Sequence, residues 1–150
     1  MMKKLFLLLS LFFGLTTLSA QNAMKENKLV GVWQLCNMTD IGFGTSPKME
    51  RVPYLKVFSP KGSLTNLMIS PKGEVFLTME GSYDLKSDTS YVEHIGKLLV
   101  SSAMDGRDNE MTYEFLDENV LMITFQIVDN KGEVLNCQEV WERVVMPDRE

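Results

Sequence analysis

Residues 119–132, with the sequence NVLMITFQIVDNKG, decide the fold of this chain. From Leu121 to Ile127 a large apolar residue stands at every second position, and Thr124 and Gln126 lie between them. A period of two is that of a β-strand with one buried face. The residues that follow favour a tight turn, because Gly and Asn tolerate positive φ. The segment therefore predicts a strand that ends in a turn.

The same pattern extends in both directions along the chain. The tetrapeptide Ser-Pro-Lys-Gly occurs at residues 59–62 and again at 70–73, and further turn clusters lie at 105–109 and 117–119. Pro sets φ for the second position of a turn. About eight to ten strands at a spacing of about 8–12 residues predict an antiparallel sandwich or barrel. Residues 22–29 are long enough for one or two helical turns before the first strand.

Short motifs along the strand series narrow this prediction to one type of fold. The motifs are Gly31-Val32-Trp33, Lys56-Val57-Phe58, Gly81-Ser82-Tyr83, Tyr91-Val92-Glu93 and Val140-Trp141-Glu142-Arg143. Together they resemble the lipocalin-like domains of unknown function of small secreted bacterial proteins. The resemblance implies an all-β fold, a single up-and-down antiparallel β-barrel with a short N-terminal helical turn. A strand of some other β-sandwich is the alternative for Gly31-Val32-Trp33.

The resemblance also implies how the barrel is closed. In lipocalins a Trp of the first strand plugs one end, and a late Arg packs across its ring, where cation–π attraction holds it. Here these roles fall to Gly31, Trp33, Trp141 and Arg143. The side chains expected to line the interior and to contact a ligand are Trp33, Leu35, Tyr83, Tyr113, Phe125 and Arg143.

The start of the chain has the order of a secretory signal peptide. Two lysines at 3–4 precede an apolar run at 5–18, and small residues follow at 19–20. The run is short for a membrane-spanning helix, which needs about 20 apolar residues. An uncleaved anchor is the alternative. The first cysteine is Cys36, far from the apolar run, so a lipoprotein anchor is not expected.

We therefore divide the chain into a signal peptide, residues 1–20, and one lipocalin-like domain, residues 21–150, that is secreted or periplasmic. Without the signal peptide the formal charge falls from −5 to −7. An acidic chain argues against binding to nucleic acid or to an anionic membrane, since both need clustered Lys and Arg. No transmembrane segment is expected after signal removal, and the oligomeric state stays open.

Cys36 and Cys137 stand near the two ends of the domain, in strands that would pair to close a barrel. An oxidising compartment favours a disulfide. Strand alternation argues against it, because Cys36 lies three positions from Trp33 and Cys137 lies four positions from Trp141. If both Trp side chains point inward, the cysteines lie on opposite faces. Two buried thiols are slightly favoured over the bridge.

Polar residues offer little evidence of catalysis. His94 is the only histidine, and no nucleophile motif accompanies it. Arg143 is suited to bind a ligand carboxylate in bidentate fashion, although stacking on Trp33 with Glu139 as ion partner is the favoured role. We expect no catalytic residue, no cofactor and no metal site, since a single His and two Cys offer few ligands.

The sequence leaves three functions open. The first is binding of a small apolar or amphipathic molecule in the barrel interior, because a barrel of about eight strands holds either side chains or one ligand. The second is an envelope or extracellular interaction module that contacts protein or glycan through the loops at 41–53 and 103–109. The third, an enzyme, lacks a recognisable arrangement of residues and is least favoured.

Overall fold

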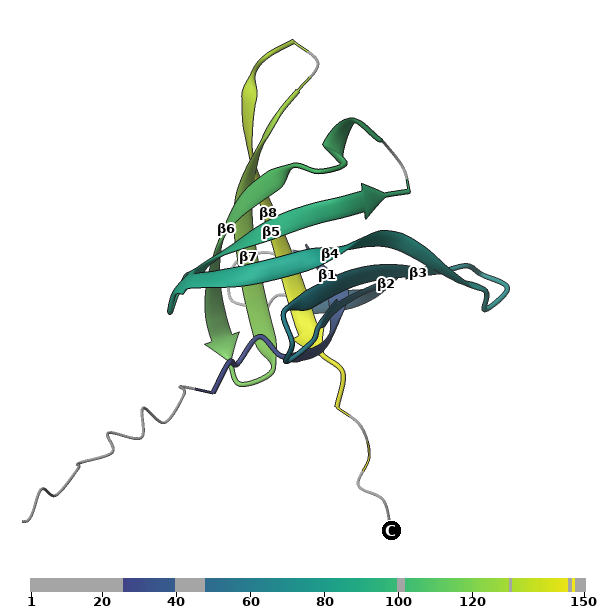
Figure 1. The fold of residues 1–150 in the computed structure, drawn as a ribbon. Coiled ribbons are helices and arrows are strands. Elements are labelled where there is room, and N and C mark those ends of the chain that lie inside the picture. Colours follow the sequence, from purple (N-terminus) through teal and green to yellow (C-terminus); the bar gives the residue numbers. More distant parts are fainter. Residues whose placement is uncertain (1–25, 40–47, 100–101, 130, 146, 148–150) are drawn as a thin grey trace, which may run out of the picture.

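The computed structural model describes residues 26–39, 48–99, 102–129, 131–145 and 147, so the predicted signal peptide lies outside the described residues. Eight strands form a closed antiparallel barrel in which each strand pairs with its neighbours in the chain and β8 returns to β1 (Figure 1). The strands are β1 (Gly31–Thr39), β2 (Lys48–Phe58), β3 (Ser63–Ile69), β4 (Val75–Ser87), β5 (Ser90–Leu98), β6 (Asp108–Asp117), β7 (Val120–Val128) and β8 (Val134–Arg143). The predicted all-β up-and-down barrel is confirmed.

Helical structure is almost absent from the described part of the chain. Ahead of β1 there is one hydrogen-bonded turn, in which the Val30 N–H donates to the Asn27 carbonyl over 3.1 Å. The 3-10 helix η1 (Ser102–Met104) lies between β5 and β6. Of the loop predicted at residues 41–53, residues 48–53 instead form the first half of β2. Residues 40–47 lie outside the described residues.

The repeated Ser-Pro-Lys-Gly motif forms two hairpin turns of the same construction. In each turn the Gly N–H donates to the Ser carbonyl, and the Ser hydroxyl accepts from the Lys N–H. The Gly adopts a φ of 84° at Gly62 and 83° at Gly73. This is a type I turn followed by a left-handed residue, a common hairpin connection. The sequence motif therefore specifies the β2–β3 and β3–β4 connections.

The barrel is sealed at the end where the chain enters β1. The Trp33 ring is fully buried, its Nε1–H donates to the Leu29 carbonyl over 2.8 Å, and the Arg143 guanidinium lies 4.1 Å above the ring. Arg143 also donates to the carbonyls of Val30 and Lys28. The predicted stacking of Arg143 on Trp33 is present. The predicted ion pair with Glu139 is not formed, because backbone carbonyls take the guanidinium hydrogens.

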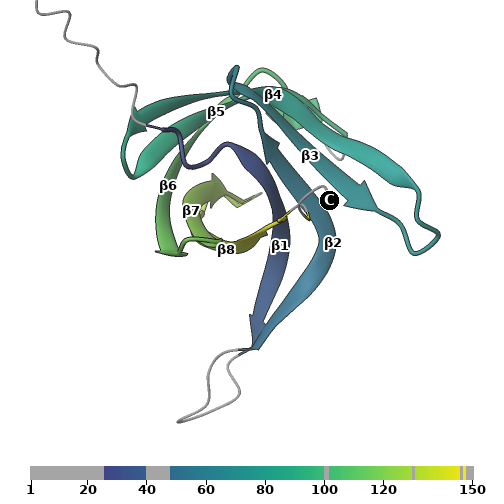
Figure 2. The ribbon, with the colours of Figure 1, turned by 90° about the horizontal axis from the view of Figure 1, so that it is seen from below.

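The opposite end of the barrel is flared (Figures 1 and 2). Ladders between hairpins stop before the strands end, and the last pairs are Tyr54–Met68, Met79–Leu98, Met111–Phe125 and Cys36–Val140. The hairpins β1–β2, β3–β4 and β7–β8 continue beyond this level, to Thr39–Lys48, Ile69–Val75 and Val128–Val134. We call this the open end. These projecting hairpins keep their own pairing but are not paired with the neighbouring hairpins there.

The lower half of the barrel is filled by a compact apolar core. Its buried members are Leu29, Trp33, Phe58, Leu64, Met79, Tyr83, Tyr91, Ile95, Met111, Leu121, Ile123 and Trp141. Phe58, Tyr83 and Tyr91 pack edge to face, with ring centroids 5.0–6.3 Å apart. Edge-to-face packing is a favoured geometry for aromatic rings. The closed end is therefore occupied by the protein's own side chains.

Gly31 lies against Arg143 at the sealed end, so a substitution there measures how much this contact contributes to stability. Its φ is +145°, and a Cβ there would lie 2.6 Å from Arg143 Nη1. We predict that Gly31→Ala lowers the free energy of unfolding by about 1–3 kcal/mol through backbone strain and displacement of Arg143. Gly73→Ala is the matched control, because Gly73 also has a positive φ but a Cβ there meets nothing within 4 Å. Urea unfolding followed by Trp fluorescence measures both, and an equal loss in the two variants would show that the contact with Arg143 is unimportant.

Candidate functional site

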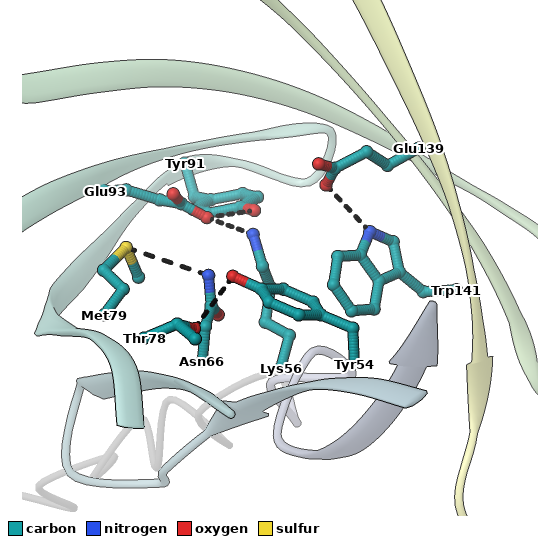
Figure 3. Close-up of polar contacts among 9 residues, drawn as sticks. All are labelled: Tyr54, Lys56, Asn66, Thr78, Met79, Tyr91, Glu93, Glu139 and Trp141. Atoms are coloured by element: carbon teal, nitrogen blue, oxygen red, sulfur yellow. Dashed lines mark hydrogen bonds and ion pairs between the residues drawn. The ribbon is translucent and has the colours of Figure 1, made fainter. Parts of the chain in front are cut away.

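A group of polar side chains lies inside the barrel above the apolar core. On β2 the residues Tyr54, Lys56 and Phe58 share the inward face, because side chains alternate along a strand. Lys56 is only 3% exposed, and Glu93 of β5 is equally buried at 4%. Charged side chains are almost never this buried unless they are paired. We call Lys56, Glu93, Glu139 and Asn66 the polar cluster (Figure 3).

Lys56 and Glu93 form an ion pair across the interior. Lys56 Nζ donates to Glu93 Oε1 over 2.7 Å, and the Tyr91 hydroxyl donates to the same oxygen over 3.0 Å. Burial by itself lowers the pKa of Lys56, but the charges of Glu93 and Glu139 outweigh it, and the pKa is raised. Lys56 is therefore a cation at neutral pH. Burial raises the pKa of Tyr91 well above its usual value, so its hydroxyl stays a donor.

Glu139 of β8 places a second carboxylate near the same ammonium group. It accepts from Trp141 Nε1–H over 3.1 Å, and Lys56 Nζ lies 5.2 Å from the centre of the Trp141 ring. Burial raises the pKa of Glu139, Glu93 raises it further, and Lys56 opposes both. The cluster thus contains one ammonium group and two carboxyl groups. At full ionisation it carries a net charge of −1.

Asn66 of β3 completes the cluster with an unused acceptor. The side chain is 7% exposed, and its Oδ1 has no hydrogen-bond partner. Its Nδ2 donates to Met79 Sδ over 3.8 Å, and nearby the Thr78 hydroxyl donates to the Tyr54 hydroxyl over 3.0 Å. A buried polar atom without a partner costs about 1–3 kcal/mol. An interior that leaves such an atom unpaired has capacity for a further hydrogen-bond donor.

Between the polar cluster and the open end, the inward faces of the hairpins are apolar and reached by solvent. Met68 pairs with both Tyr54 and Phe76, and paired residues share a face. On the other wall Ile127 pairs with Leu135. Leu135 lies four residues before the inward Glu139 on β8, so both side chains are on the inward face. These four residues, which we call the mouth residues, are each 39–43% exposed. The open end therefore presents an apolar rim above a polar floor.

The residues predicted to contact a ligand all belong to the barrel wall, but none belongs to the polar cluster. Trp33 and Arg143 form the seal, and Tyr83 is buried in the closed half, where its hydroxyl donates to the Ser59 carbonyl. Leu35, Tyr113 and Phe125 are partly buried against the core. Trp141, predicted as part of the closure, is a core residue that lies beside Tyr54 and Lys56, at the edge of the polar cluster.

Sequence reasoning missed Lys56, Glu93 and Asn66 as site residues. A signal was present, because Lys56 stands between Tyr54 and Phe58 at inward positions and Glu93 stands likewise between Tyr91 and Ile95. A charge at a position that alternation assigns to the core requires a buried partner. The partner lies 37 positions away, so alternation alone does not identify it.

The two cysteines are separate thiols in the structure. Cys36 pairs with Val140 and Cys137 pairs with Phe125, so the two side chains lie on opposite faces of the barrel wall. Burial raises the pKa of Cys36, so less of this thiol is ionised to the reactive thiolate. The opposite faces are those that strand alternation predicts, but of the two thiols expected to be buried only Cys36 is, since Cys137 is partly exposed.

His94 lies on the outer surface, away from the polar cluster. Its Nδ1 is 2.7 Å from Asp108 Oδ1 and its Nε2 is 3.1 Å from Asp84 Oδ2. The three residues sit side by side on β4, β5 and β6. Among the described residues, no group of three His, Cys, Asp or Glu side chains could hold a metal ion. His94 therefore links three strands as part of the outer wall.

These features define a small closed antiparallel β-barrel protein with a buried polar cluster below a flared end. Residues 28–150 match the family described as domain of unknown function DUF4488, and the chain belongs to that family. No curated protein matches the chain. Within the described residues, no helix is long and apolar enough to cross a membrane.

The Lys56–Glu93 pair makes a stability prediction. Lys56→Met should lower the free energy of unfolding by about 3–5 kcal/mol, because it leaves the Glu93 carboxylate buried without its cation. Adding Glu93→Gln should recover much of this loss, since Gln is neutral and still accepts from Tyr91. Urea titrations of the two single variants and the double variant measure the coupling.

The exposed pair of Arg51 and Glu142, also 2.7 Å apart, supplies the control. Arg51→Met should cost far less than Lys56→Met, because water replaces the lost contact at the surface. Equal losses at the two pairs would show that burial of Lys56 and Glu93 has no energetic consequence.

The environment of His94 predicts the sign of a pH effect. The hydrogen bond to Asp108, followed by that to Asp84, raises the pKa of His94. Because the pKa of His94 is higher in the folded state, its protonation stabilises the fold. This contribution to the free energy of unfolding is fully present below the unfolded pKa of about 6.5 and is lost as pH rises through the folded pKa. His94→Asn should make the free energy of unfolding less dependent on pH in this range. Urea midpoints across the pH range test it, and an NMR titration of this single histidine with a midpoint at or below about 6.5 would contradict it.

Proposed function

We propose that the barrel binds one small amphipathic molecule and performs no catalysis. Its polar group lies at the polar cluster, and its apolar part lies against the mouth residues Met68, Phe76, Ile127 and Leu135. The observation that carries this proposal is the unpartnered Oδ1 of Asn66, which is 7% exposed beside the Lys56–Glu93 ion pair. A guest that donates a hydrogen bond to it removes a cost that the free protein bears.

The layering of the interior supports an amphipathic guest over a purely apolar one. The closed end is filled by aromatic side chains, the middle is polar, and the open end is apolar and exposed to solvent. Ligand sites are commonly apolar with a few placed polar groups that fix orientation. A polar group at the floor and an apolar part at the rim match this order.

We propose further that the protein acts outside the cytoplasm. The support is the basic, apolar and small-residue order of residues 1–20. A compartment outside the cytoplasm is consistent with a binding protein that collects or carries a small molecule.

One observation favours the alternative, an interaction module. On the outward face of the β7–β8 hairpin, Val128 is 68% and Val134 is 58% exposed. Exposed apolar side chains of this kind can mark a contact surface for another macromolecule. The two functions use opposite faces of the same hairpin, so neighbouring residues separate them.

The test compares Leu135→Asp on the inward face with Val134→Asp on the outward face. The reporter is N-phenyl-1-naphthylamine, an apolar amine whose fluorescence rises on leaving water. We expect saturable binding of one molecule per barrel to the unchanged protein, a loss of at least about tenfold in affinity in Leu135→Asp, and no change in Val134→Asp. Native mass spectrometry of the purified protein checks the stoichiometry.

Two outcomes would contradict interior binding. One is fluorescence that does not saturate. The other is an equal loss of affinity in both variants, which would place the reporter on the outside of the hairpin. Far-UV circular dichroism of each variant establishes that the strands are retained.

A further inference from the structure

We infer that the polar group accepted by this interior is a cation, specifically the ammonium group of an amphiphilic amine. The inference rests on the proposed function and specifies its ligand class. It is carried by the charged groups of the polar cluster and by its one unused acceptor, Asn66 Oδ1. Figure 3 shows how these side chains lie relative to one another.

The cluster contains more carboxylates than cations. Lys56 already gives a hydrogen bond of 2.7 Å to Glu93, and Tyr91 donates to the same carboxylate. Glu139 is a second acid group close enough to influence the pKa of Lys56. A guest ammonium would balance the second carboxylate. A guest carboxylate would be a third anion around a single ammonium group, and like charges repel strongly where water is scarce.

Among the described residues, the buried side-chain atom that has no hydrogen-bond partner at all is an acceptor. Asn66 Oδ1 has no partner, whereas Asn66 Nδ2 faces Met79 Sδ. The orientation of this amide is chemically reasonable, because a thioether sulfur is a weak acceptor and cannot donate. Reversing the amide would put its oxygen against the sulfur, where no donor exists. Asn66 therefore needs a donor, and an ammonium group has three.

The aromatic side chains next to the polar cluster favour the same class of guest. Trp141 and Tyr54 pack against each other at 6.2 Å, and Lys56 lies 5.2 Å from the Trp141 ring centre. Aromatic faces attract cations and repel anions. Charge, hydrogen bonding and ring electrostatics thus agree on a cation.

The distance from the floor to the rim sets the length of the apolar part. Leu135 lies four residues before Glu139 on β8, and four residues of strand span about 13 Å. An unbranched chain of eight carbons is therefore a suitable probe. It extends from the polar cluster toward the mouth residues without requiring further sites.

The experiment compares n-octylammonium, n-octanol and n-octanoate by isothermal titration calorimetry with the full chain at neutral pH. These probes share the apolar part and differ in charge. We expect the affinity to fall in the order ammonium, alcohol, carboxylate, with at least about tenfold between the first and the last. The unchanged protein suffices for this comparison, so it does not depend on any variant folding.

A pair of variants locates the charge. Glu139→Gln should weaken n-octylammonium by about tenfold and leave n-octanol unchanged. Glu114→Gln makes the same chemical change at an exposed position on the outer face of β6 and should alter neither. An equal effect of the two variants would overturn the assignment of the cation to the interior.

The outcomes separate this inference from the proposed function. If n-octanoate binds as tightly as n-octylammonium or more tightly, the cation inference is overturned while interior binding stands. If n-octanol equals n-octylammonium, charge has no role and the inference is again overturned. If none of the three probes binds up to its solubility, the inference and the proposed function both fail.

Discussion

The ion pair between Lys56 and Glu93 is the interaction on which the interior depends. An ammonium group this deeply buried is tolerable only beside an anion. The two residues lie on β2 and β5, with β3 and β4 between them along the wall, so the pair spans the barrel. It fixes which face of each strand points inward, because a register shift of one residue in either strand would turn one charge outward and leave the other buried without its partner. The ion pair lies between the apolar core of the closed end and the mouth residues of the open end.

Local chemistry explains why most of the fold could be predicted from the sequence. The turns at residues 59–62 and 70–73 are specified by their own Ser, Pro and Gly, and alternation along residues 121–127 depends on a single strand. The seal by Trp33 and Arg143 could be predicted only through the family resemblance that the motifs around these two residues carry. The expected partner of Arg143 was wrong. Whether its guanidinium meets Glu139 or nearby backbone carbonyls depends on three-dimensional positions that the spacing of residues in the sequence does not give.

The polar cluster and the flared end depend on contacts between distant segments. Lys56 and Asn66 stand in strands that otherwise read as ordinary amphipathic sequence, and their role appears only when the barrel closes. At the flare β4 is no longer paired with β5 beyond Met79–Leu98, although it stays paired with β3 as far as Ile69–Val75, and the pairing is irregular at Thr78 and Gly96. A bulge inserts one residue and bends a strand. Such insertions leave only weak traces in composition or in alternation.

The energetics of the interior bear on why a polar cluster is present at all. Replacing a buried ion pair with well-packed apolar residues is often neutral or stabilising. A barrel that served only as a scaffold would therefore lose nothing by filling its middle as it fills its closed end, with aromatic rings. Instead the chain places two carboxyl groups around one ammonium group and leaves Asn66 Oδ1 without a partner. The proposed binding of an amphiphilic cation accounts for both features, because it supplies the missing donor and the missing positive charge together.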